Sequence, residues 1–160
     1  MRTTLIILFL ISFVSAKGLR VDGHDFLKGL LDGVGEKTAP DKLYTCLKNM
    51  PAIMTSIHQG LVQMEVMKQA QLTVGVKAVF TAAKDLLTLL EPCDSSGYET
   101  LKKLDTLLTN YDLKKTVSTI LNRTSEYAYV VREALGGFEN KQYVVAGRNV
   151  GVILKMIFFS

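Results

Sequence analysis

The sequence predicts an all-α protein, a compact bundle of about five to six helices with one disulfide. Nearly every segment repeats its apolar residues with a helical period, and almost none alternates them as a strand would. The chain contains only three prolines, and each stands where a helix would begin or end. Burying the apolar faces of such helices against one another gives a helical bundle.

In the first half of the chain the apolar pattern places helices at about residues 25–34, 40–47, 51–71 and 74–90. Pro51 opens the third of them, at the position where its missing N–H costs least. The fourth is strongly amphipathic, and its apolar face consists of Val76, Val79, Phe80, Ala83, Leu87 and Leu90.

In the second half of the chain the next helix begins near Ser95 or Ser96, either of which can cap it. The longest predicted helix covers about residues 112–135, and the two glycines at 136–137 terminate it. A final helix covers about residues 139–158.

The beginning of the chain has the features of a secretory signal peptide. Arg2 supplies a short positive region, residues 5–14 are apolar, and the following small residues end in Ala16. We therefore predict a signal peptide over residues 1–16 and a single helical domain over residues 17–160, in the extracellular space or the secretory-pathway lumen. The alternative is a retained membrane anchor, but the apolar run is shorter than the roughly 20 residues that span a bilayer.

The charge of the chain is mildly positive, with a formal net charge of +4. The lysines and arginines are spread along the sequence without a basic block. Nucleic-acid binding requires clustered basic residues, so we predict no nucleic-acid partner. A weak attraction to anionic membrane surfaces is compatible with this charge.

Cys46 and Cys93 are the only cysteines. In a secreted chain an even pair predicts a disulfide, which here would join the two ends of a helical hairpin. Closing a loop of this length stabilises a fold by about 4 kcal/mol. Two cysteines without a C-x-x-C spacing, and the distant His24 and His58, offer no ligand set, so we predict no metal and no cofactor.

Two pairs of glycines have the same spacing near opposite ends of the chain. Gly29 and Gly33 lie four apart, as do Gly147 and Gly151, and positions four apart share one face of a helix. A face without side chains lets two helix backbones approach closely. We predict that the first and last helices pack against each other, or each against a neighbour, through these faces. The alternative is that Gly29 and Gly33 mark a poorly formed helix.

Two surface features of the second half suggest contacts with other molecules. Lys141, Arg148 and Lys155 are spaced by seven and form a basic stripe, roughly opposite the glycines of the last predicted helix. The stripe is either a solvated face or a face that contacts lipid headgroups. The sequon at Asn122 points away from the apolar face of its helix, so we predict N-glycosylation there. The alternative is an unmodified, exposed asparagine.

No catalytic constellation is recognisable in the sequence. The serines lack a G-x-S-x-G setting, and no paired carboxylates stand at helical spacing, so we predict that the protein is not an enzyme. Methionines cluster in the third predicted helix and around it, which is typical of a core or of an apolar cavity that admits a lipid. The favoured prediction is a secreted, non-enzymatic binding protein for a lipid or other hydrophobic ligand. The alternative is a secreted structural or protein-interaction module, inhibitor-like or self-assembling, with a protein partner or a second copy as its ligand.

Several short motifs carry a family resemblance. The segments "DFLKGLLDGVGE", "LYTC", "LEPC" and "AGRNVGVILK" resemble a group of small secreted helical proteins of ciliated protists. The resemblance covers most of the chain after the predicted signal peptide. It implies that the two glycine-containing helices belong to one recurring design, and it implies neither catalytic residues nor a ligand.

Overall fold

The computed structural model describes residues 22–35, 49–93 and 95–159, and this part of the chain forms seven helices and no strand. The all-α prediction is confirmed, whereas the expected number of helices, five to six, is too low. The helices cover residues 22–34, then α2 Met50–Glu65, α3 Gln69–Leu90, α4 Ser95–Asn110, α5 Leu113–Asn122, α6 Thr124–Glu139 and α7 Tyr143–Phe158. The helix predicted at 40–47 lies outside the described residues.

Six of the predicted helices fall within the described residues, and the structure has seven there because the segment predicted as one long helix over 112–135 is two helices. The backbone breaks at Arg123, with φ −129° and ψ 40°, and the side chain of Arg123 pairs with Glu126 in the first turn of α6. The apolar period continues through this break, since Val117, Ile120, Tyr127 and Val131 all face the same core. A pattern that records only which side is buried cannot reveal a change of helix axis.

The end of α6 also differs from the prediction. The helix does not stop at residue 135 but continues through Gly136 and Gly137 to Glu139. Gly137 is buried and tightly packed, because a Cβ built on it would lie 2.5 Å from the Ala146 backbone nitrogen. Neither glycine therefore ends the helix. Gly137 instead allows α6 to pack closely against Ala146.

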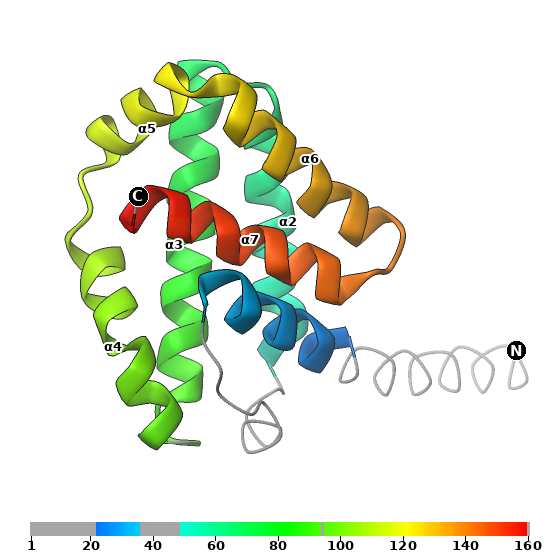
Figure 1. Cartoon of the computed structure of the whole chain (residues 1–160), viewed down its shortest axis with the longest axis vertical. Coiled ribbons are helices and arrows are strands. Elements are labelled where there is room, and N and C mark those ends of the chain that lie inside the picture. Colours follow the sequence, from blue (N-terminus) through cyan, green and yellow to red (C-terminus); the bar gives the residue numbers. More distant parts are fainter. Residues whose placement is uncertain (1–21, 36–48, 94, 160) are drawn as a thin grey trace, which may run out of the picture.

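The helices form two main layers (Figure 1). The antiparallel α2–α3 hairpin forms one layer, and the helix over 22–34 and α7 lie side by side across it. α6 precedes α7 in a second hairpin, and α4 and α5 lie along α3. No helix in the described part of the chain is both long and apolar enough to cross a membrane.

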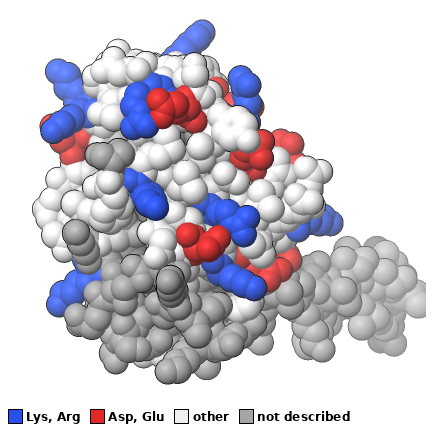
Figure 2. Space-filling view, viewed as in Figure 1, with Lys and Arg blue, Asp and Glu red and all other residues white. Residues whose placement is uncertain are grey.

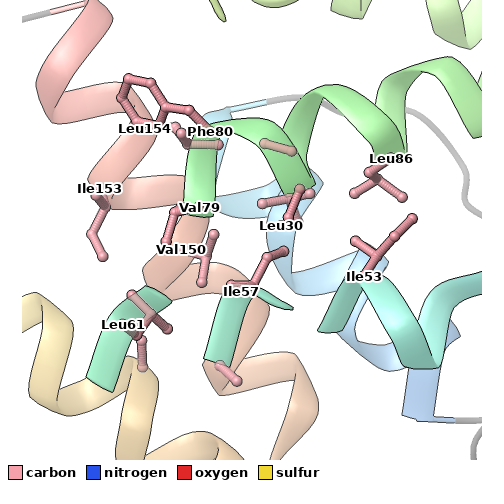
Figure 3. Close-up of a cluster of buried hydrophobic side chains, with 14 of the residues drawn as sticks. Leu30, Ile53, Ile57, Leu61, Val79, Phe80, Leu86, Val150, Ile153 and Leu154 are labelled. Carbon is pink, nitrogen blue, oxygen red and sulfur yellow. The ribbon is translucent and has the colours of Figure 1, made fainter. Parts of the chain in front are cut away.

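The core lies between these layers and is closely filled. Figure 3 shows side chains from the first helix, α2, α3 and α7 interdigitating, among them Leu30, Ile57, Leu61, Phe80, Val150 and Leu154. An enclosed apolar pocket, lined mainly by leucines of the first helix, α3, α4 and α7, has a volume of about 10 Å³. That is room for about one water molecule, so this part of the core does not hold a ligand.

The structure packs the glycine pair of the first helix, Gly29 and Gly33, against the glycine pair of α7, Gly147 and Gly151. A Cβ on Gly29 would overlap the carbonyl oxygen of Val144, and a Cβ on Gly147 would overlap that of Phe26. The Cα of Gly33 would lie 2.9 Å from a Cβ on Gly151. We call this contact between the first helix and α7 the glycine seam. It fixes the start of the first helix beside the start of α7, where the candidate site lies.

Candidate functional site

A groove runs between the start of α2 and the end of the α6–α7 hairpin. Its volume is about 400 Å³, and it is lined by Pro51, Met54, Thr55, His58, Phe138, Glu139 and Tyr143. We call it the aromatic groove. Three of its seven lining residues carry a ring that contacts another ring, which distinguishes it from two other grooves, one between α2 and α3 and one between α3 and α5.

Local sequence places each wall of the groove. Pro51 stands in the first turn of α2, and Met54, Thr55 and His58 follow at three-, four- and seven-residue offsets. These offsets put all four residues along one side of the helix. The opposite wall is formed by the last turn of α6 and the first turn of α7.

The turn between α6 and α7 holds the second wall in place. Lys141 adopts a left-handed backbone conformation with φ 55°, and the N–H of Gln142 donates to the carbonyl oxygen of Gly137 at 2.7 Å. The reversal is therefore tight, and it brings the rings of Phe138 and Tyr143 within 6.2 Å of each other, centroid to centroid.

Phe138 is the central ring of the groove. Its centroid lies 5.6 Å from that of Phe26, 5.1 Å from that of His58 and 6.2 Å from that of Tyr143. Separations of this size are typical of favourable ring contacts. Phe138 is only partly buried, so it packs against the core and also faces the groove.

Carboxylates lie close to the groove in the described part of the chain. Burial raises the pKa of Asp22, the nearby Asp25 carboxylate raises it further, and Lys141 acts in the opposite direction. Burial also raises the pKa of the Tyr143 hydroxyl, and the negative charge of Asp22 adds to that effect. Elsewhere, on the face shown in Figure 2, basic and acidic side chains are interspersed.

The groove therefore offers an aromatic floor with a few polar groups at its rim. An imidazole, a phenol hydroxyl and a carboxylate converge on it from His58, Tyr143 and Glu139. A concave, mainly apolar site with a small number of polar groups is the usual form of a small-molecule site. Within the described ranges, no group of three or more His, Cys, Asp or Glu side chains could hold a metal ion.

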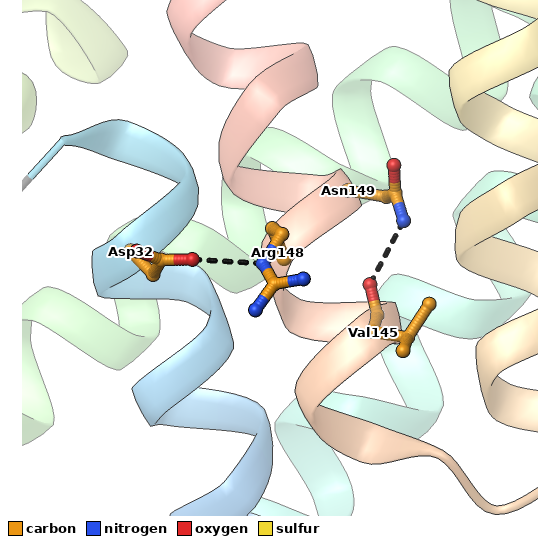
Figure 4. Close-up of polar contacts among 4 residues, drawn as sticks. All are labelled: Asp32, Val145, Arg148 and Asn149. Atoms are coloured by element: carbon orange, nitrogen blue, oxygen red, sulfur yellow. Dashed lines mark hydrogen bonds and ion pairs between the residues drawn. The ribbon is translucent and has the colours of Figure 1, made fainter.

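The three residues of the predicted basic stripe lie in different settings, which corrects the prediction of one stripe on the last helix. Lys141 lies in the turn before α7 rather than on the helix. Arg148 lies beside the glycine seam rather than opposite it, and its Nε donates to Oδ2 of Asp32 at 2.7 Å (Figure 4). Lys155 is exposed in the last turn of α7.

The other predicted positions lie away from the groove. Asn122 is exposed and is the last residue of α5, so its glycosylation stays a prediction. Cys93 is partly buried in the turn after α3, and Cys46 lies outside the described residues, so the disulfide also stays a prediction. His24 lies within the first helix, with its Nδ1 3.7 Å from Oδ1 of Asp25.

Sequence reasoning missed the groove because its walls come from distant parts of the chain. The spacing of Pro51, Met54, Thr55 and His58 was the available signal, since it marks one helix side that mixes apolar and polar residues. The periodicity of α2 cannot show that Phe138 lies opposite the side of α2 that carries these residues. No family model, no curated protein and no solved structure matches the chain.

Proposed function

We propose that this protein is a secreted, non-enzymatic binding protein that takes an apolar group of its ligand into the aromatic groove. The observation that carries this proposal is the convergence of the Phe26, His58 and Tyr143 rings on Phe138 beside an open groove of about 400 Å³. The enclosed pocket of about 10 Å³ is far too small for a lipid chain. A hydrophobic ligand would therefore bind at the surface rather than within this part of the core.

Filling the groove with a bulky side chain tests the proposal. Thr55 is exposed at the groove, and its hydroxyl donates to the carbonyl oxygen of Pro51 at 2.8 Å. A neutral fluorescent probe, N-phenyl-1-naphthylamine, should bind the natural protein and bind Thr55→Trp about tenfold more weakly, the loss expected when one ring can no longer be buried.

Thr88→Trp is the matched control. Thr88 is also an exposed helical threonine, with the equivalent hydrogen bond to the carbonyl oxygen of Lys84 at 3.1 Å, but it does not line the aromatic groove. Probe binding should be unchanged in this variant. Equal binding by Thr55→Trp and the natural protein would rule out the groove as the ligand site.

The second candidate is a protein-interaction module or self-assembling bundle. Large apolar side chains are exposed near the α2–α3 turn, where Val62, Val66 and Val74 are 44%, 48% and 59% accessible. Isolated exposed valines are common on protein surfaces, which is why this candidate ranks second. Native mass spectrometry separates the two candidates, because a dimer peak supports self-assembly and a co-purified small molecule supports the groove.

The proposed secretion has covalent consequences that intact mass measures directly. Cleavage after Ala16 sets the N-terminus, and a Cys46–Cys93 disulfide removes two hydrogens from the expected mass. Glycosylation at Asn122 adds a mass that an N-glycosidase removes. Material purified from a eukaryotic secretion host that retains residues 1–16 or carries two free thiols would contradict this part of the proposal.

A further inference from the structure

We propose that the aromatic groove is selective for an organic cation, an alkylammonium group of the quaternary type, recognised by the rings around Phe138 and by the carboxylate of Glu139. This inference rests on the proposed function, because it names the chemical class of ligand that the same groove takes.

The arrangement of the rings supports this class of ligand. The planes of Phe138 and Tyr143 are inclined at 76°, and those of His58 and Phe138 at 55°. Rings at such angles do not stack in parallel, and all three residues line the groove, so one ligand group in the groove can meet more than one ring. The faces of Phe and Tyr rings carry negative potential and attract cations, and quaternary ammonium groups are bound in cages of this kind.

The charges beside the rings favour the same sign of ligand. Glu139 is exposed and lines the groove, and Asp22 acts electrostatically on Tyr143. Asp25 and Lys141 both act on Asp22, so the described charged groups that interact around Tyr143 include two carboxylates and one ammonium group, and Glu139 adds a carboxylate to the groove itself. The whole chain has a formal charge of +4, so this local acidity is contrary to the overall charge. A cation is complementary to these carboxylates, and an anion is not.

The remaining walls suit the alkyl part of the ligand. Pro51 and Met54 supply apolar surface next to the rings, and the flexible thioether of Met54 adapts to varied shapes. A quaternary ammonium group has methyl groups around its charge, so it gains from this apolar surface while its charge meets the rings and Glu139. The same chemistry occurs in free choline and in the headgroup of a choline phospholipid.

The test compares choline with 3,3-dimethylbutan-1-ol, its uncharged carbon analogue, by NMR titration of ¹⁵N-labelled protein. Choline should change the chemical shifts of the backbone amides of residues 54–58 and 138–143. The neutral analogue should bind more weakly than choline, by a factor of up to about five, in line with the strength of a cation–π contact. Equal affinity for the two compounds, or no shift in these segments with choline, would overturn the inference.

Two variants assign the selectivity to its source. Glu139→Gln should weaken choline binding about threefold and leave the neutral analogue unaffected, as expected for one exposed charge. Phe138→Leu keeps apolar bulk but removes the central ring, so it should reduce the preference for choline to the part that Glu139 and the remaining rings supply. Glu133→Gln, an exposed acid of α6 that does not line the groove, is the matched control and should change neither affinity.

Vesicle sedimentation distinguishes the two sources of the cation. Sedimentation with phosphatidylcholine vesicles identifies a lipid headgroup, and binding of free choline without sedimentation identifies a small soluble ammonium compound. Sedimentation with phosphatidylcholine vesicles that an excess of free choline does not reduce would contradict the inference. The probe experiment with Thr55→Trp judges the groove independently, so the groove can be confirmed as a site even where its preference for a cation is disproved.

Discussion

Two of the helix crossings that bring backbones into contact through glycine are built differently. In the glycine seam, each of the four glycines faces backbone atoms of the opposite helix. In the α2–α3 hairpin each helix contributes one glycine. A Cβ on Gly75 would lie 2.5 Å from the carbonyl oxygen of Gly60, whereas the nearest atom to a Cβ on Gly60 is the Cγ2 of Val79, at 2.8 Å.

The difference concerns what can move. A side chain that is too close can rotate away, but a backbone that is too close requires a whole helix to shift. The glycine seam should therefore tolerate no added methyl group, and the α2–α3 crossing should tolerate one on α2 better than one on α3.

The largest effect should come from the glycine seam. Gly29→Ala and Gly147→Ala should each lower the free energy of unfolding by about 3 kcal/mol, the upper end of the usual range for overpacking. The loss would appear despite the better helix propensity of alanine. Denaturant unfolding followed by circular dichroism measures it. A change below about 1 kcal/mol in both variants would show that the seam can relax.

The α2–α3 crossing should show an unequal pair of effects. Gly75→Ala should cost about 2 kcal/mol because its methyl group would meet the backbone of Gly60 and Met64. Gly60→Ala should cost about 1 kcal/mol, because the nearest backbone atom to its methyl group, the carbonyl oxygen of Gly75, would lie 3.0 Å away rather than 2.5 Å. Equal losses in denaturant unfolding would remove the distinction between backbone and side-chain contacts.

The two neighbouring glycines of α6 provide an internal calibration. A Cβ on Gly136 would have no neighbour within 4 Å, so Gly136→Ala should stabilise the fold by about 0.5–1 kcal/mol through helix propensity alone. Gly137→Ala should instead destabilise it, since its methyl group would meet the Ala146 backbone. Thermal unfolding of both variants gives opposite shifts if packing, rather than propensity, decides the fate of a buried glycine.

The smallest effect should come from the ion pair beside the seam. The side chains of Arg148 and Asp32 are 52% and 62% exposed, and exposed pairs contribute little. Asp32→Asn should lower stability by about 0.5 kcal/mol at low ionic strength. The difference should disappear at about 1 M salt, where charges are screened within about 3 Å. A loss that persists in high salt would mean that Asp32 acts through hydrogen bonding rather than through its charge.

The two crossings also differ in how far the sequence predicts them. Gly29, Gly33, Gly147 and Gly151 occur as two pairs with a four-residue spacing, which marks a helix face without side chains. Gly60 and Gly75 occur singly, and a single glycine in a helix has no spacing to interpret. The aromatic groove has the same difficulty, because Phe138 is an ordinary apolar residue until the α6–α7 turn places it opposite His58.

Local sequence is enough to establish that this chain is helical, which face of most helices is buried, and which glycines form smooth faces. These properties depend on residues three or four positions apart, so local periodicity carries them. Packing in three dimensions is needed to bring the two glycine faces together, to divide α5 from α6 at Arg123, and to place His58, Phe138 and Tyr143 around one groove. These features depend on which helix becomes the neighbour of which, and periodicity along one helix holds no information about its partner.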